Sequence, residues 1–207
     1  MKTKTASGRM GRPVGFDKEA ALEAAMLLFW ERGFEGTSMA DLIHAMGINA
    51  SSIYAAFGDK QSLFGLAAKR YLETRAQYAA DALQEPTLER VIRALFDNTV
   101  AFLTSAEHPA TCMTLVGAMG CGVDGRQARD LMTGVRVQNE ADIRQRLIVA
   151  QEAGEFPEDQ NLEDYTRYLS MLLAGLSIQS ANGSTEAELK RTAQMALQYL
   201  GYSDTSA

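Results

Sequence analysis

The sequence predicts an all-α protein with about nine helices, in which a small N-terminal three-helix domain precedes a larger helical body. Apolar residues recur three and four positions apart through most of the chain, and no segment alternates polar and apolar residues for long enough to form a strand. Capping residues and glycines also divide the chain at helical intervals. The expected units are a basic arm over 1–16, a helix-turn-helix domain over 17–62 and the helical body over 63–207.

Residues 37–60 predict two short helices joined by a tight turn, with a third helix beginning at their end. Ser38 and Asp41 have the spacing of a capping box at the start of the first of these helices. Gly47 can adopt the left-handed conformation that ends a helix, and Asn49 can cap the next one. The outer side of that second short helix carries small polar residues, as expected for a helix that enters a DNA major groove.

The remaining helices follow from apolar periodicity and from the positions of proline, glycine and capping residues. Asp17 is a good N-cap for the first helix, Asp59 caps a long helix, and Pro86 opens the one after it. The expected ranges are 17–33, 59–83, 87–107, 111–119, 126–153, 162–181 and 184–200.

The charge of the chain is unevenly distributed. The net charge is −6, which alone argues against a nucleic-acid partner. Residues 1–16 nevertheless contain Lys2, Lys4, Arg9 and Arg12 and no acidic residue, so the deficit lies in the body. Short basic arms of this kind can place arginines in a narrow minor groove. A neutral N-terminal third with a basic arm on an acidic body suits a protein that presents one end to DNA, although a tail with chance basic residues fits as well.

Composition excludes several other classes. The hydrophobic and charged fractions, 46% and 22%, are those of an ordinary globular protein. No apolar run approaches the length of a membrane helix, and no signal peptide pattern begins the chain. The only cysteines are Cys112 and Cys121, which fits a reducing cytoplasm rather than a disulfide framework. Two cysteines and two histidines do not make a zinc site, so no metal or other cofactor is expected.

Residues 120–125 satisfy the string G-x-G-x-x-G, which raises an enzymatic alternative. A dinucleotide fingerprint requires a preceding strand, and none is expected here. No nucleophile is paired with a base, so catalytic residues are not expected either. Redox sensing through Cys112 or Cys121 stays open, because it depends on an exposed thiol of low pKa. A helical adaptor or dimerisation module without DNA binding is the other alternative.

The last two helices have broad apolar faces and small residues, which suits both a buried core and a homodimer interface of four packed helices. The residues that would form such an interface are Leu169, Leu172, Leu173, Leu176, Leu189, Ala193, Ala196, Leu197 and Leu200.

The body is also rich in Met and aromatic residues, which can line an adaptable apolar pocket for a small hydrophobic or aromatic effector, although ordinary core is the alternative for each of them. The candidates for this pocket are Phe96, Thr99, Phe102, Met113, Met119, Met132, Gln138, Tyr165 and Tyr168.

The N-terminal segment resembles the DNA-binding domain of the tetracycline-repressor (TetR) family of bacterial transcription regulators. The resemblance covers roughly 17–64, and the body matches only as an all-helical domain of suitable length. The residues that carry it, each at the expected spacing, are 25–33 (AMLLFWERG), Phe34, 37–38, 41–43, 45–48, 52–54, Phe57, Lys60 and 63–64.

The resemblance implies a homodimeric repressor that binds a palindromic operator in double-stranded DNA and is released by an effector in the body. The recognition helix carries no arginine or glutamine, so it offers no bidentate contact to guanine. Readout would then rely on small contacts, on the arm and on DNA shape. The expected DNA-binding residues are Arg9, Arg12, Ser38, Asn49, Ala50, Ser51, Ser52, Tyr54 and Lys60.

Overall fold

The structure of the protein is a computed structural model, which describes residues 15–202 except 118 and 120. Over these residues it contains ten α-helices and no strand, which confirms the predicted all-α class. None of the helices in this described part is both long enough and apolar enough to cross a membrane.

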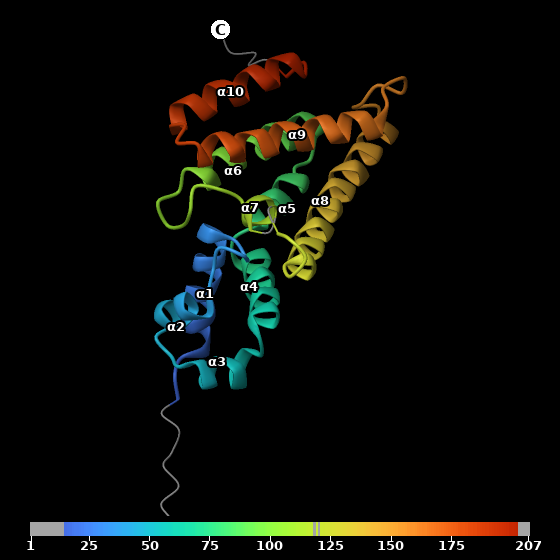
Figure 1. Ribbon diagram of the computed structural model, residues 1–207. Helices are drawn as coiled ribbons and strands as arrows, with labels where there is room; N and C mark the ends of the chain where they lie inside the picture. Colours follow the sequence, from blue (N-terminus) through green and yellow to red (C-terminus); the bar gives the residue numbers. More distant parts are fainter. Residues whose placement is uncertain (1–14, 118, 120, 203–207) are drawn as a thin grey trace, which may run out of the picture.

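Four helices form the N-terminal end of the molecule: α1 (Lys18–Arg32), α2 (Met39–Met46), α3 (Ala50–Phe57) and α4 (Lys60–Thr74). Each begins at a side chain that accepts a hydrogen bond from its first turn, as the sequence predicts. Gly47 ends α2 with a φ of 66° in the left-handed region. The short helices α2 and α3 lie at one tip of the molecule, and α4 leads away from them toward the body (Figure 1).

Six helices form the body: α5 (Gln77–Leu83), α6 (Leu88–Leu103), α7 (Met113–Val116), α8 (Arg126–Glu152), α9 (Leu162–Ala181) and α10 (Glu186–Tyr199). The helices α6, α9 and α10 stack at the end of the molecule opposite α3, and the long helix α8 runs along one side (Figure 1). The short helix α7 lies at the middle, where it contacts both α1 and α8.

The long helix expected over 59–83 is two helices, which raises the count from nine to ten. The chain breaks at Arg75 and Ala76, where both backbone N–H groups donate to the carbonyl of Tyr71. No glycine or proline marks this break. Arg75 instead bonds Glu23 of α1 at 2.9 Å, so a tertiary contact accompanies the interruption. The helix expected over 87–107 also ends earlier, at Leu103.

Buried apolar residues form two clusters, which we call the N-terminal core and the body core. The N-terminal core joins α1–α4 to Met113 of α7 and to Met132 of α8. The body core joins α6, α9 and α10 to α5 and the second half of α8. Because residues of α4 also belong to the first cluster, the four N-terminal helices pack together.

Most of the residues expected at a dimer interface are already covered within the single chain. Five of them, Leu169, Leu176, Leu189, Ala193 and Leu197, are buried in the body core. The other four, Leu172, Leu173, Ala196 and Leu200, are partly buried and pack against the same core. The apolar faces of α9 and α10 that the sequence reveals are therefore mainly the faces that these helices turn toward the rest of the chain.

Candidate DNA-binding surface and ligand cavity

The outer face of α2 and α3 gathers several of the residues expected to contact DNA. Ser38, Asn49 and Ser51 are exposed, and Tyr54 is 53% exposed although its neighbour in sequence, Ile53, is fully buried. Of the others, Ala50 and Ser52 are partly buried. An exposed tyrosine beside small polar residues gives α3 a surface that can approach a phosphate backbone closely.

Capping bonds hold the polar side chains of this face. Ser38 and Asp41 form the predicted capping box, in which Asp41 N–H donates to Ser38 Oγ at 3.1 Å. These hydrogen bonds with Ser38 lower the pKa of Asp41 below its usual value. Asn49 Oδ1 accepts from Ser52 N–H at 2.9 Å and from Ser51 Oγ at 2.7 Å. The amide nitrogen of Asn49 keeps its donors for another partner.

Lys60 is placed differently from the rest of the set. Its ammonium group lies 4.4 Å from the centroid of the Phe34 ring, a cation–π arrangement. Burial lowers the pKa of this ammonium group, and the nearby Glu35 opposes that effect. A contact with phosphate would require Lys60 to leave this position. Arg9 and Arg12 of the expected arm lie outside the described residues.

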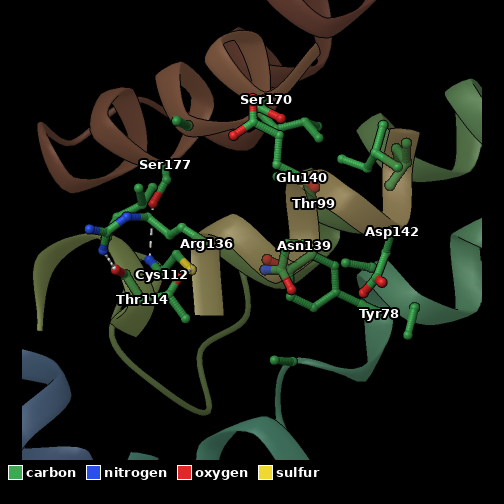
Figure 2. A pocket seen from close by; sticks show the side chains of 18 of the residues that line it. Tyr78, Thr99, Cys112, Thr114, Arg136, Asn139, Glu140, Asp142, Ser170 and Ser177 are labelled. Carbon is green, nitrogen blue, oxygen red and sulfur yellow. Dashed lines mark hydrogen bonds between the residues drawn. The ribbon is translucent and has the colours of Figure 1, made fainter. Parts of the chain in front are cut away.

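The body contains a cavity of about 550 Å³, which is within the range that small-molecule sites occupy. Its apolar wall comes from each of the helices α4 to α9, and polar side chains reach it from α5, α6, α8, α9 and the start of α7. Figure 2 shows two polar groups within it: one contains Cys112, Thr114, Arg136 and Ser177, and the other contains Thr99, Glu140 and Ser170.

The first polar group is bonded internally. Ser177 Oγ accepts from Cys112 N–H at 3.0 Å, and Cys112 Sγ lies 3.0 Å from Thr114 Oγ1. Arg136 donates through Nη1 to the carbonyl of Thr114 and through Nη2 to Thr133 Oγ1, the latter at 2.9 Å. Two of the five guanidinium N–H donors are thus bonded to protein acceptors.

Of the nine residues expected to line an effector pocket, Thr99 lines this cavity. Three others, Phe96, Met113 and Met132, are core residues, and Tyr165, which also borders a smaller hollow, belongs to the body core as well. Phe102 stacks on Tyr78, whose ring does line the cavity, at a centroid distance of 4.3 Å. The remaining four lie elsewhere: Met119 and Gln138 are exposed, and Tyr165 and Tyr168 line a smaller hollow of about 250 Å³.

Residues 21–67 match the sequence pattern of the family described as bacterial regulatory proteins, tetR family. Over 185 residues the chain is 30% identical to the HTH-type transcriptional repressor ComR of Escherichia coli (strain K12), with 88% of each protein covered. It is also 32% identical over 198 residues to the repressor BdcR of the same strain, with 95% of each covered. The chain belongs to the TetR family.

A solved structure of a cysteine mutant of the TetR family regulator CifR, in complex with operator DNA of 26 base pairs, has a similar fold. It is 33% identical in sequence, superposes with a TM-score of 0.87, and the match covers 91% of this chain and 98% of that one. The TetR-family chain is therefore a DNA-binding transcriptional regulator with an N-terminal helix-turn-helix, and its family is one of regulators rather than enzymes.

Residues 111–117 connect the cavity of this TetR-family regulator to its helix-turn-helix. On one side Cys112 and Thr114 line the cavity. On the other side Trp30 Nε1 donates to the carbonyl of Thr111 at 2.9 Å, a buried hydrogen bond between residues 81 positions apart. Phe34 N–H donates to the carbonyl of Gly117 at 2.8 Å. The end of α1 is thus bonded to the segment that forms one wall of the cavity.

The turn between α1 and α2 receives two further contacts from the same region. Gly33 has a φ of 72°, and a side chain there would meet the carbonyl of Gly117 at 3.3 Å, so both backbone conformation and space favour glycine. The Glu35 carboxylate accepts from Gly122 N–H at 2.5 Å. The glycine-rich string of 120–125, so far as it is described, is a helix–helix connection that contacts the helix-turn-helix, and no strand precedes it.

The two cysteines occupy different environments. Cys121 is buried, and its pKa is raised first by that burial and then by the nearby Glu35, which opposes formation of a reactive thiolate. Cys112 is partly exposed and lies on the cavity wall, where its sulfur is 3.4 Å from the hydroxyl of Tyr71.

Sequence reasoning missed the polar residues of the cavity, namely Tyr78, Cys112, Arg136, Glu140 and Ser177. The criterion applied to the sequence was an abundance of Met and aromatic residues, and most residues of that kind are in the two cores. A signal did exist on α8, where Arg136 and Glu140 are four residues apart and so share one side of the helix. The partners on α5, α7 and α9 could not be inferred without the fold.

Proposed function

We propose that this TetR-family regulator is a repressor that binds a palindromic operator as a homodimer and is released when a small molecule occupies the 550 Å³ cavity. The observation that carries the proposal is the exposed face of α2 and α3, formed by Ser38, Asn49, Ser51 and Tyr54, on a domain that matches the family. Both curated relatives described above are named repressors, which favours repression over activation.

The dimer is proposed to form through the outer sides of α9 and α10. Tyr168, Met171 and Ile178 are 41%, 60% and 42% exposed and follow one another along α9 at intervals of three and seven residues. Met195 and Tyr199 continue the apolar surface on α10, with exposures of 56% and 83%. A second copy would cover these side chains, as a symmetric helical interface requires. They replace the buried residues that the sequence alone suggested.

The proposed release mechanism uses the connection between the cavity and α1. A ligand that displaces Arg136 or Ser177 from residues 111–117 would disturb the hydrogen bond that Thr111 accepts from Trp30. In a dimer this would change the separation of the two recognition helices, and an operator has a fixed spacing between its half-sites. The ligand would bind more tightly to one separation of the recognition helices and DNA to the other, so binding of each would weaken binding of the other.

If the protein senses redox state, Cys112 is the candidate, because burial and the raised pKa of the Cys121 thiol disfavour reaction at Cys121. An adaptor without DNA contact is disfavoured by the family match over the helix-turn-helix. The protein is expected to act in the cytoplasm, where operator DNA is available.

The proposal is tested by fluorescence anisotropy with labelled DNA from upstream of the gene itself, titrated at two salt concentrations. We expect binding to this DNA to be tighter than to random DNA of equal length, and affinity to fall steeply with salt because phosphate contacts release counterions. Equal affinity for both DNAs at low salt would contradict the proposed function. A size measurement of the free protein then checks the dimer.

A further inference from the structure

We propose that the cavity binds an amphipathic amine: a small apolar molecule whose protonated amino group is held by Glu140, Thr99 and Ser170. This inference rests on the proposed function only in that it concerns the same cavity. It goes further by naming the chemical class of the ligand, and it is argued from groups that lack partners in the structure.

Thr99 provides the first observation. It lies on α6, is 6% exposed and lines the cavity. Threonines in helices commonly donate to the backbone carbonyl four residues earlier, as Thr104 does to Val100 at 2.9 Å. Within the described part of the chain the hydroxyl of Thr99 has no hydrogen-bond partner. This hydroxyl is open to the cavity, so its donor and its acceptor are both available to a polar ligand group.

Glu140 provides the second observation. This residue of α8 lines the cavity, is partly buried, and takes part in no ion pair or hydrogen bond with any described residue. Glu163 of α9, by contrast, is paired with Arg144 of the same helix α8. In the view of Figure 2 Glu140 points toward Ser170 of α9, and Thr99 of α6 lines the same cavity. Three helices therefore contribute one carboxylate and two hydroxyls to the lining of the cavity.

The charge of the cavity favours a cation over an anion. Its lining contains two carboxylates, Glu140 and Asp142, and one basic side chain, Arg136. Arg136 already donates one N–H to Thr114 and one to Thr133, so only part of its donor set is open to a ligand. Asp142 is exposed and accepts from Gln138 at 2.8 Å, which leaves Glu140 as the carboxylate available inside. An ammonium group would supply the missing charge and three hydrogen-bond donors.

The apolar residues of the lining indicate the chemistry of the remaining part of the ligand. Leu95 and Leu103 of α6, Leu83 of α5 and Leu173 of α9 contribute apolar surface to the lining. A volume of about 550 Å³ accommodates an aryl or alkyl body of modest size in addition to the amino group. The ligand class is thus an arylalkyl or alkyl amine, not a carboxylate.

The test uses three probes with one apolar body and different head groups: phenylbutylamine, phenylbutanol and phenylbutyrate. Their dissociation constants are measured by isothermal titration calorimetry at pH 7, where the amine is protonated. For the unmodified protein we expect the amine to bind about tenfold more tightly than the alcohol, because a charge-assisted contact to a carboxylate is added. A butyrate that binds as tightly as the amine, or an amine too weak to measure, would overturn the inference.

Two variants locate the amino group. Glu140→Gln should weaken the binding of phenylbutylamine about tenfold and change the affinity for phenylbutanol by less than about twofold. The reason is that the glutamine amide keeps the shape of the carboxylate but has no charge. Thr99→Val should weaken binding of the amine about threefold, since the hydroxyl that would accept a hydrogen bond from the ammonium group is lost. Glu152→Gln is the matched control, as it lies exposed on the same helix outside the cavity lining and should change nothing. If Glu140→Gln lost as much affinity for the alcohol as for the amine, the placement of the amino group at Glu140 would be overturned.

The same titrations separate this inference from the proposed function. If phenylbutylamine binds in a manner that depends on Glu140 but leaves the operator complex intact, the ligand class stands and the release mechanism fails. If the protein binds its operator and no amine occupies the cavity, the DNA-binding function stands and the ligand class fails. Thermal melting of each unliganded variant shows that the altered chains are folded.

Discussion

All four helices of the N-terminal unit begin at a capping side chain, whereas α5, α7 and α8 of the body begin without one. These three uncapped helices are also three of the elements that surround the cavity. The N-terminal helices are thus specified by residues next to them in sequence. The three uncapped helices around the cavity depend more on contacts with distant residues, such as the bond from Arg136 of α8 to Thr114. Elements held in this second way can move when a ligand replaces one of those contacts.

Matched leucine truncations give the largest expected difference between the two regions. Leu63 is fully buried in the N-terminal core, and Leu95 is 2% exposed but borders the cavity. We expect Leu63→Ala to lower the free energy of unfolding by about 4 kcal/mol and Leu95→Ala by about 2 kcal/mol, because Leu95 already lacks neighbours on one side. Urea unfolding followed by circular dichroism measures both losses. Equal losses would show that the cavity wall packs as tightly as the core.

Trp30→Phe tests the connection between the regions. Phenylalanine keeps an aromatic ring near Phe102 but cannot donate to the carbonyl of Thr111. Leaving that buried carbonyl without its partner should cost about 1–3 kcal/mol of stability. Release of the operator by a cavity ligand should also weaken, as measured by anisotropy. If the ligand shifts operator affinity as strongly in this variant as in the unmodified protein, the hydrogen bond is not part of the coupling.

Lys60→Ala tests whether the lysine leaves Phe34 to bind phosphate. A phosphate contact predicts weaker binding to all DNA sequences and a salt dependence flattened by roughly one unit. The structure supplies the competing outcome, in which Lys60 stays over the Phe34 ring and its loss affects stability alone. An unchanged salt slope would remove Lys60 from the DNA-binding set.

Glu23→Gln should have the smallest effect on the free energy of unfolding, and the size of this effect should depend on pH. Burial alone would raise the pKa of Glu23, but bonds from Arg75 and Arg70 lower it below its ordinary value of 4.5. The stabilising contribution is therefore complete above about pH 4.5 and is lost as pH falls through the lower folded-state pKa. We expect a loss of about 1 kcal/mol or less at pH 7 and none at pH 2, measured by urea unfolding. If the two proteins differed in free energy of unfolding by the same amount at pH 2 and at pH 7, the stabilising role of the ionised Glu23 would be contradicted.

The helix-turn-helix could be read from the sequence because its determinants are local. The spacing of Ser38 and Asp41 predicts the capping box that forms, and Gly47 predicts the turn. Asn49 likewise caps α3 as expected. Such signals act over a few residues and need no knowledge of the fold.

The cavity could not be read in the same way because its lining comes from distant segments. Thr99, Glu140 and Ser170 are 41 and 30 positions apart along the chain, and helix packing alone brings them together. The same limit explains the dimer residues: periodicity shows that Leu169 and Leu197 are on apolar faces but not which neighbour covers them. Residue type was a poor guide to the cavity for the same reason, since Met113 and Met132 fill the core.

The central claim, that DNA binds at the face of α3 and the ligand in the body, is tested most directly by one anisotropy experiment on Tyr54→Ala and Glu140→Gln. Each variant is titrated with operator DNA, with and without phenylbutylamine. We predict that Tyr54→Ala loses operator affinity while its calorimetric affinity for the amine is unchanged, and that Glu140→Gln keeps operator affinity but no longer releases DNA with the amine. Loss of operator affinity in Glu140→Gln, or full affinity in Tyr54→Ala, would contradict this division of the molecule.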